Sequence, residues 1–307
     1  MTPHPIDLTR LTAPVQRIDA YLAQVLDDKD LDLAPNLCDA MKYAVLNGGK
    51  RLRPLLAWYC CEALGAPGEE SLAAGAAVEL VHAFSLVHDD LPALDNDDLR
   101  RGKPTLHRHS GEAMAILAGD ALLTLAFSHL AATGAPSEWL AKATTSMITG
   151  QVLDTLAGPP QRESAAERVE LIHAKKTGAL IAAACQMGGQ SALRWFFKTG
   201  GARDGRTATL CNLDREDHLI GYARAIGLLF QIVDDLIDVE QTAESVGKRT
   251  GKDAAAGKLT YPAVLGIEGS RAKVRELHQQ ALDALAPLGP PAQPLRDLAH
   301  YLATRTR

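Results

Sequence analysis

Residues 72–98 read LAAGAAVELVHAFSLVHDDLPALDNDD, and this stretch decides the fold class. Apolar side chains recur three or four residues apart through its first part, which predicts a long α-helix over residues 69–91. The sequence then changes abruptly, because five carboxylates fall within residues 89–98. The helix dipole disfavours negative charge at the C-terminal end of a helix. The pattern therefore predicts a long buried helix that ends where a cation can bind.

The same helical spacing continues along most of the chain. Breaks such as Asn47-Gly48-Gly49 and Gly158-Pro159-Pro160 separate the apolar segments. Aromatic residues, which favour strands, make up only 5% of the 307 residues, whereas alanine is abundant and is the strongest helix former. The sequence therefore predicts an all-α protein with helices at 15–29, 36–46, 51–64, 69–91, 110–132, 136–157, 163–189, 214–239, 258–268, 270–286 and 292–304.

The chain shows no low-complexity linker and no internal repeat. We therefore expect a single domain over residues 1–307, which is long enough to bury a substantial core. Residues 194–212 depart from the helical pattern, since they combine consecutive aromatics, glycines and cations without a clear period. We expect an inserted surface loop there, because added loop length costs little stability. A lid or a role at a subunit edge is the alternative for this segment.

Charge and cysteine content exclude several classes of protein. The chain carries 32 basic and 37 acidic side chains, so its formal charge of −5 does not favour binding to nucleic acid. Its five scattered cysteines are typical of free thiols in a reducing compartment. The N-terminal residues lack the pattern of a signal peptide, and Asp120 and His129 interrupt the longest apolar run. We expect a cytoplasmic protein without a membrane span.

A second acidic cluster, Asp234-Asp235-Leu236-Ile237-Asp238, also ends an apolar helix. Its first and last aspartates are four residues apart, so they share one helical face. In the first cluster, Pro92 should end or bend the helix and bring Asp95 back toward Asp89. Carboxylates of this kind suit Mg²⁺, which binds oxygen ligands and substrate phosphates. Either cluster alone could be a solvated helix end, but two clusters with the same Asp-Asp start favour a metal site.

Basic residues occur close to both clusters in the sequence. Flexible glycine, lysine as a point charge and arginine as a two-pronged donor are what binding of a diphosphate requires. Each basic segment alone is more often part of the surface, but together they predict a diphosphate site. The segments are Gly48-Gly49-Lys50-Arg51-Leu52-Arg53, Arg100-Arg101-Gly102-Lys103, Lys175-Lys176-Thr177-Gly178, and Lys248, Lys252 and Lys258.

Taken together, these segments resemble the trans-isoprenyl diphosphate synthases, and most closely the bacterial farnesyl diphosphate synthase type. The matching stretches follow the family's order and span most of the chain. They are LNGGKRLRP (46–54), ELVHAFSLVHDDLPALDNDDLRRGKPTLH (79–107), LAGDALL (117–123), GQVLD (150–154), KKTGALI (175–181), GLLFQIVDDLIDV (227–239) and GKDAAAGKLTYP (251–262). The resemblance implies a helix bundle around a central active-site cavity, a homodimer, and several Mg²⁺ ions for which Mn²⁺ can substitute.

The resemblance also implies roles for individual residues. It implies metal binding by Asp89, Asp90, Asp95, Asp234 and Asp238, and catalytic roles for these residues, Asp235 and Lys176. It implies binding of an allylic diphosphate by Arg100, Lys176, Thr177, Gln231, Lys248 and Lys258. It implies binding of isopentenyl diphosphate by Lys50, Arg53, His82 and Arg101.

The implied activity joins isopentenyl diphosphate to dimethylallyl or geranyl diphosphate, with farnesyl diphosphate (C15) as the main product and inorganic diphosphate as the leaving group. In the family, the residue five positions before the first aspartate limits product length, and this residue is Phe84. It lies roughly 7.5 Å along the helix from Asp89. Helical geometry places Ser85 more directly beneath Asp89, so both residues are candidates for the floor of the cavity.

Several alternatives remain open at this point. A geranyl (C10) or geranylgeranyl (C20) diphosphate synthase would share the same chemistry. A class I terpene cyclase would not need the isopentenyl site, a noncatalytic partner subunit would lose one aspartate cluster, and a cation-binding helical scaffold would release no diphosphate. Both clusters and all four isopentenyl-site residues are present, which favours the transferase.

Overall fold

The computed structural model describes residues 6–157, 164–200, 213–244 and 259–305. These residues are helical apart from turns and one short hairpin, so the all-α prediction is confirmed. The longer helices are α2 (Val15–Leu26), α3 (Pro35–Leu46), α4 (Leu52–Ala63), α5 (Leu72–Asp89), α7 (Glu112–Thr133), α8 (Glu138–Val152), α9 (Ala165–His173), α10 (Ala179–Thr199), α12 (Leu213–Glu244), α14 (Tyr261–Leu285) and α15 (Gln293–Thr304). The shorter elements are α1 (Leu8–Thr12), α6 (Leu106–Ser110), the strands β1 (Leu99–Arg100) and β2 (Lys103–Pro104), and two π-helical turns, Leu153–Ala157 and Ala174–Gly178.

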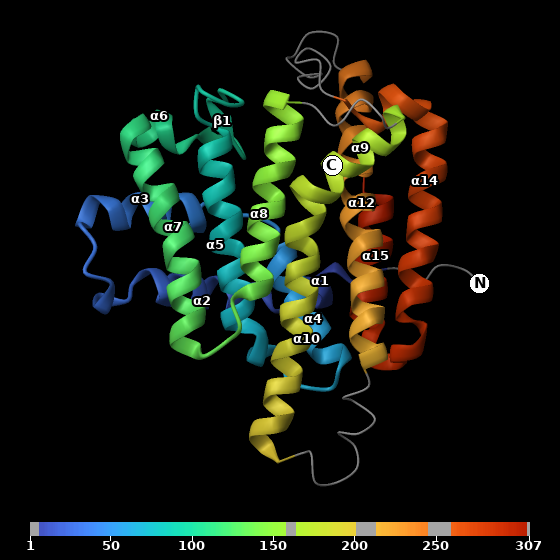
Figure 1. The fold of residues 1–307 in the computed structure, drawn as a ribbon, viewed down its shortest axis with the longest axis horizontal. Helices are drawn as coiled ribbons and strands as arrows, with labels where there is room; N and C mark the ends of the chain where they lie inside the picture. The colour runs from blue at the N-terminus through green and yellow to red at the C-terminus, as the bar shows by residue number, and fades with distance from the viewer. Residues whose placement is uncertain (1–5, 158–163, 201–212, 245–258, 306–307) are drawn as a thin grey trace.

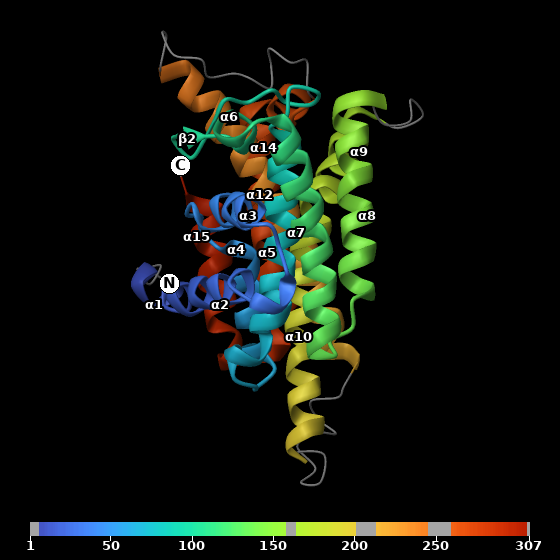
Figure 2. The ribbon, with the colours of Figure 1, turned by 90° about the vertical axis from the view of Figure 1, so that its left-hand side faces the viewer.

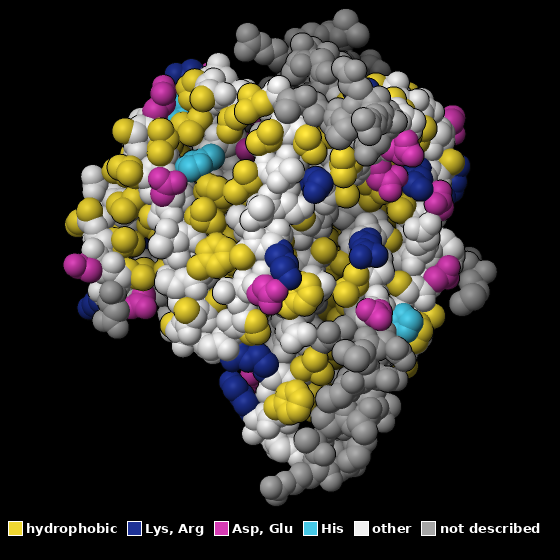
Figure 3. Space-filling model, viewed as in Figure 1, with side chains coloured by type: hydrophobic (Ala, Val, Ile, Leu, Met, Phe, Trp, Pro, Cys, Tyr) yellow, Lys and Arg dark blue, Asp and Glu magenta, His cyan; other side chains and the backbone are white. Residues whose placement is uncertain are grey.

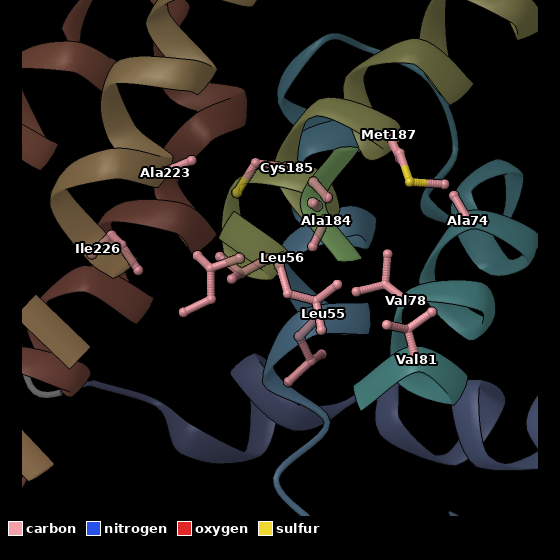
Figure 4. Close-up of a cluster of buried hydrophobic side chains, with 14 of the residues drawn as sticks. Leu55, Leu56, Ala74, Val78, Val81, Ala184, Cys185, Met187, Ala223 and Ile226 are labelled. Atoms are coloured by element: carbon pink, nitrogen blue, oxygen red, sulfur yellow. The ribbon is translucent and has the colours of Figure 1, made fainter. Parts of the chain in front are cut away.

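The core lies where α4, α5, α10 and α12 pack together. Leu56, Val78, Cys185 and Ile226 come from these four helices and are fully buried (Figure 4). α5 and α12 run in the same direction, so their C-terminal ends, which carry the two aspartate clusters, lie at the same end of the bundle (Figure 1). Figure 2 shows α8 and α9 on one side of the central helices and α1, α2 and α3 on the other. The bundle therefore brings two segments that are far apart in the sequence to one end of the molecule.

Glycine allows α4 and α10 to approach closely. A Cβ atom added at Gly188 would lie 2.2 Å from the carbonyl oxygen of Ala57 and 2.7 Å from its Cα atom. Real contacts are never this short, so any larger residue at this position must push the two helices apart. The absence of a Cβ atom at Gly188 therefore sets the distance between α4 and α10 at the centre of the core.

We expect Gly188→Ala to lower the free energy of unfolding by about 2 kcal/mol, because overpacking against the backbone outweighs the better helix propensity of alanine. Gly221→Ala is the matched control, since its Cβ would meet only Ala284 Cβ at an ordinary 3.5 Å. That variant should be neutral or slightly more stable. Urea unfolding measures both, and equal stabilities of the two variants would contradict the close contact.

Three segments differ from the expected boundaries. Residues 194–199 continue α10 instead of starting a loop, because Trp195 and Phe196 pack edge to face, with ring centroids 4.9 Å apart, and lie against the core. The rest of the expected insertion, 201–212, lies outside the described residues. The expected helix 163–189 is divided by the π-helical turn Ala174–Gly178, and α14 joins two expected helices across a kink at Gly266, where φ is 71°.

Two helical segments, Gly68–Asp89 and Glu112–Thr133, are long and apolar enough to cross a membrane by length and composition alone. The first is a core segment, 67% buried in its apolar window. The second, α7, is only 39% buried in that window, and its Leu117 side chain is 57% exposed. The face of the molecule that includes α7 and α8 carries many hydrophobic side chains (Figure 3). An outer helix this apolar is expected to be covered by something else.

Candidate active site

A cavity of about 350 Å³ lies between α5, α8 and the π-helical turn Ala174–Gly178. Five charged or polar residues line it: Arg53, His82, Asp89, Lys176 and Thr177. The other lining residues are mostly apolar: Phe84, Ser85, Leu86, His88, Leu94, Met147, Ile148, Gln151, Val152 and Leu156. A cavity whose lining combines charged and apolar residues suits a ligand that has an anionic head and a hydrocarbon tail.

The first aspartate cluster contributes Asp89 to the cavity lining. α5 ends at Asp89, and the chain then turns back so that the amide of Asp95 donates to the carbonyl oxygen of Asp89 at 2.8 Å. The return of Asp95 predicted from Pro92 is thus confirmed. The pKa of Asp89 is raised to about 6, chiefly by burial; Lys176 opposes the shift and the Asp95 carboxylate contributes to it. Ionised carboxylates crowded in this way provide the hard oxygen ligands that a divalent cation prefers.

Asp90 differs from the other aspartates of this cluster. Its carboxylate is 3% exposed and accepts hydrogen bonds from Arg100 Nε at 2.8 Å and from Arg100 Nη2 at 2.6 Å. The pair attaches the β1–β2 hairpin to the end of α5. Asp90 stays a predicted metal ligand, and in this structure the neighbouring hairpin brings the Arg100 guanidinium group to its carboxylate.

Lys176 and Thr177 reach the cavity from the π-helical turn Ala174–Gly178. Lys176 Nζ donates to Asp154 Oδ2 at 2.7 Å, and the Asp154 side chain is buried. A Cβ atom at Gly150 would lie 2.3 Å from the Lys176 amide nitrogen, so α8 touches this turn directly. Asp154 belongs to the stretch GQVLD (150–154), for which the sequence predicts no catalytic or binding role. The structure shows that Asp154 orients the Lys176 ammonium group.

A chain of hydrogen bonds joins the same turn to α12. Thr177 Oγ1 donates to Gln231 Oε1 at 2.8 Å, and Gln231 Nε2 donates to Asp235 Oδ1 at 3.2 Å. The other oxygen of Asp235 accepts the amide of Tyr261, the first residue of α14, at 3.0 Å. Asp235 is buried and anchors the start of α14, and its predicted catalytic role stays a prediction.

His173 lies beside this chain, with its Nε2 atom 3.9 Å from Asp235 Oδ2. Burial lowers its pKa to about 4. Between pH 6.5 and 4 the unfolded chain binds a proton at His173 and the folded protein does not, so the stability supplied by the neutral ring is complete above pH 6.5 and is lost as the pH falls.

We expect the free energy of unfolding of the wild-type protein to fall by about 3 kcal/mol between pH 6.5 and 4, because His173 is protonated more easily in the unfolded chain than in the folded protein. His173→Gln should remove that part of the pH dependence, whereas His109→Gln, at an exposed position, should retain it. Urea unfolding across this pH range measures the difference. Parallel pH profiles for wild type and His173→Gln would contradict the assignment.

A second cationic region lies next to the first cluster. His82 faces Arg53 and Arg101, and burial together with these cations holds its pKa well below the usual range. Arg53 Nε is buried and has no hydrogen-bond partner among the described residues. Arg101 follows β1, adopts a φ of 54°, and donates to the carbonyl oxygen of Gly48. A buried guanidinium nitrogen without a partner, close to other cations, is suited to an anion such as a diphosphate.

Arg51 belongs to the same basic segment but has a different task. Its guanidinium is buried and donates to Asp19 Oδ1 at 2.6 Å, to Glu79 Oε1 at 2.9 Å and to the carbonyl oxygen of Val45 at 2.8 Å. The two carboxylates neutralise the charge of Arg51, and the three contacts hold the start of α4 against α2 and α5.

The second cluster lies on the last turns of α12, with Asp238 one turn beyond Asp234. Burial raises the pKa of Asp234, whereas Arg305, Lys50 and Arg53 oppose the shift. The predicted diphosphate ligands Lys248 and Lys258 lie outside the described residues. Within the described ranges no three His, Cys, Asp or Glu side chains form a complete metal site. This arrangement fits Mg²⁺, which usually combines one or two carboxylates with water and substrate phosphates.

The predicted floor residues both line the cavity. Phe84 lies on α5 with its ring 4.9 Å from the ring of His88, edge to face, and it is 8% exposed. Ser85 Oγ donates to the carbonyl oxygen of His82 at 2.9 Å. Phe84 contributes the larger apolar surface, so it is the better candidate for limiting the depth of the cavity.

Comparison with known proteins gives a consistent result. Residues 34–286 match the family described as polyprenyl synthetase. The chain is 43% identical over 281 residues to geranylgeranyl pyrophosphate synthase 9, chloroplastic, of Arabidopsis thaliana. The aligned region covers 87% of this chain and 73% of the relative. Among solved structures it is similar to an FPP/GFPP synthase from Zymomonas mobilis (TM-score 0.75, 34% identity, 96% and 98% of the two chains). It is also similar to geranylgeranyl pyrophosphate synthetase from Pyrococcus horikoshii (TM-score 0.80, 27% identity, 97% and 98%).

Proposed function

Because this chain belongs to the polyprenyl synthetase family, we propose that it joins isopentenyl diphosphate to an allylic diphosphate and releases inorganic diphosphate. The observation that carries the proposal is the cavity itself. Asp89, Lys176 and Arg53 all line it, and most of the other lining residues are apolar, as a prenyl tail requires.

The residues divide the reaction between two anion sites. Divalent metal ions held by Asp89, Asp95 and Asp234 would neutralise the diphosphate as it leaves. Lys176, oriented by Asp154, adds positive charge to the cavity lining. Loss of the diphosphate leaves an allylic carbocation, which the apolar wall protects from water.

The second site holds the attacking substrate. Arg53, His82 and Arg101 bind the diphosphate of isopentenyl diphosphate in this proposal, with Lys50 beside them. The double bond of that substrate attacks the cation, and we expect the product to lose a proton to the released diphosphate. This chemistry requires no nucleophilic side chain. Both sites being present supports the transferase over a terpene cyclase, and both aspartate clusters being intact supports it over a noncatalytic subunit.

The length of the product belongs to the proposal as well. The Arabidopsis thaliana relative named above is a geranylgeranyl pyrophosphate synthase, and this supports a C20 main product over the C15 product predicted from the sequence. Farnesyl diphosphate stays as the second candidate, because Phe84 occupies the cavity wall beneath Asp89.

The test is incubation with isopentenyl diphosphate, Mg²⁺ and each of dimethylallyl, geranyl and farnesyl diphosphate, followed by mass analysis. Elongation of farnesyl diphosphate to C20 supports the main proposal, and accumulation at C15 supports the second candidate. Failure to elongate any of the three would overturn the transferase assignment. A parallel series with Mn²⁺ or with chelator tests the metal requirement, and the cytoplasmic location stays a prediction.

We further propose that the protein is a homodimer joined through α7 and α8. Leu117 and Ile116 of α7 are exposed, and so are Ile148, Val152 and Leu156, which also line the open side of the cavity. A second copy packed here would bury this apolar surface and close the cavity wall.

We expect Leu117→Glu to convert the dimer into a monomer, because a carboxylate cannot be buried without a partner in an apolar interface. Leu265→Glu is the control, since Leu265 is a similarly exposed leucine on α14 (40%). Light scattering after size exclusion measures the mass of both variants. A dimeric Leu117→Glu variant, or a monomeric wild type, would contradict this interface.

A further inference from the structure

The end of the chain returns to the second aspartate cluster. Arg305 follows α15, and its Nη2 atom donates to Asp234 Oδ1 at 2.6 Å and to the carbonyl oxygen of Phe230 at 3.0 Å. Its guanidinium carbon lies 4.2 Å from the centre of the Phe230 ring. The side chain is only 5% exposed. Two hydrogen bonds, an aromatic face and near-complete burial therefore hold this cation in one place.

The position of Arg305 matters because of its partner. The proposed function assigns Asp234 to metal binding, and the present inference rests on that assignment. A metal ion that binds through Asp234 Oδ1 competes with the guanidinium group, since both are cations and both use the lone pairs of that oxygen. Lys50 and Arg53 also act on Asp234 electrostatically, but Arg305 makes the direct contact.

We propose that Arg305 is a built-in counterion of the second aspartate cluster, which holds Asp234 in the metal-free protein and is displaced from it when a divalent cation binds. Pairing lowers the energy of a carboxylate that is partly buried and lies one helical turn from Asp238. The same pairing competes with the metal. The arrangement favours metal loading when a diphosphate supplies additional oxygen ligands, because these ligands offset the loss of the Arg305 contact.

The experiment is a titration of full-length protein with Mn²⁺ alone, in which electron paramagnetic resonance measures the free ion. Arg305→Gln removes the competing charge and keeps most of the side chain's volume. We expect it to bind one Mn²⁺ ion about tenfold more tightly than wild type, the effect of losing one charged hydrogen bond. Asp234→Asn in the same background should abolish the gain.

Arg271→Gln is the matched control. Arg271 also pairs with carboxylates, Glu240 at 2.7 Å and Glu268 at 2.9 Å, but it is half exposed and lies on α14. Its loss should leave Mn²⁺ affinity unchanged. Equal Mn²⁺ affinity in wild type and Arg305→Gln, or no detectable Mn²⁺ binding in either, would overturn the proposal.

Thermal unfolding supplies a second readout, which does not depend on activity. Without metal, Arg305→Gln should unfold at a lower temperature than wild type, and saturating Mn²⁺ should narrow that difference, because the metal has already displaced Arg305 in wild type. If Arg305→Gln does not fold, Arg305→Lys takes its place and should show an intermediate gain in Mn²⁺ affinity. A temperature difference that Mn²⁺ leaves unchanged contradicts the proposal. Neither readout requires prenyl transfer. Failure of the elongation assay would overturn the proposed function, whereas unchanged Mn²⁺ affinity in Arg305→Gln would overturn the counterion role, so the two failures can be told apart.

Discussion

Asp89→Ala should lower kcat/KM for prenyl transfer by about 10²- to 10³-fold or more, the cost of removing a group that stabilises developing charge in a buried site. Asp89 ends α5 and lines the cavity, beside Asp95 and facing Lys176. Without its carboxylate, a metal ion loses the ligand that places it against the leaving diphosphate. The fold should persist, because the raised pKa of Asp89 shows that burial disfavours the ionised side chain.

Steady-state kinetics with geranyl and isopentenyl diphosphate measure the loss, and circular dichroism checks the fold. Asp283→Ala provides the control, since Asp283 is exposed on α14, its carboxylate accepts a hydrogen bond from the side-chain amide of Gln279, and neither residue lines the cavity. That variant should keep normal turnover. Near-normal turnover in Asp89→Ala would contradict the role of the first cluster.

Phe84→Ala should lengthen the main product by at least one five-carbon unit. The Phe84 ring fills the cavity beneath Asp89 and packs edge to face on His88, whose Nε2 atom lies 3.1 Å from the carbonyl oxygen of Ile116 on α7. Truncation to a methyl group leaves space into which a longer tail can extend. The same change should cost about 3 kcal/mol of stability, as is usual for a buried phenylalanine.

Mass analysis of the product distribution measures this effect. Phe196→Ala is the matched control, because Phe196 lies on α10, packs on Trp195 and does not line the cavity. It should leave product length unchanged while also lowering stability. An unchanged distribution in Phe84→Ala would show that another residue ends the cavity, with Ser85 the first to examine.

The sequence predicts those features that depend on neighbouring residues. The spacing of apolar side chains gives α5 and α12, because a helix repeats every 3.6 residues whatever it packs against. Pro92 predicts the turn that returns Asp95 to Asp89, and the hydrogen bond between their backbones confirms it. The family resemblance adds the residues of both anion sites, which the helices bring to one end of the bundle.

Features that depend on distant contacts could not be predicted in this way. The sequence does not distinguish Asp90 from Asp89, because the hydrogen bonds from Arg100 to the Asp90 carboxylate form only when the hairpin folds. Asp154 meets Lys176 because two π-helical turns lie side by side, and nothing local marks that contact.

The extent of α10 could not be predicted for a similar reason. Consecutive aromatic residues at 195–197 suggested irregular structure, whereas partial burial against the core keeps Trp195 and Phe196 helical. Arg305 lies 71 residues from Asp234 and enters the site only through the return of α15 along α12. Product length depends on the shape of the whole cavity, so the C15 prediction from Phe84 alone is not confirmed.

The most direct test of the central claim is the rate of diphosphate release from geranyl diphosphate in the presence of Mg²⁺, measured with and without isopentenyl diphosphate. We expect rapid release only when both substrates are present, with one diphosphate formed for each five-carbon unit added to the product. Equally rapid release from geranyl diphosphate alone, or no release with both substrates, would contradict it.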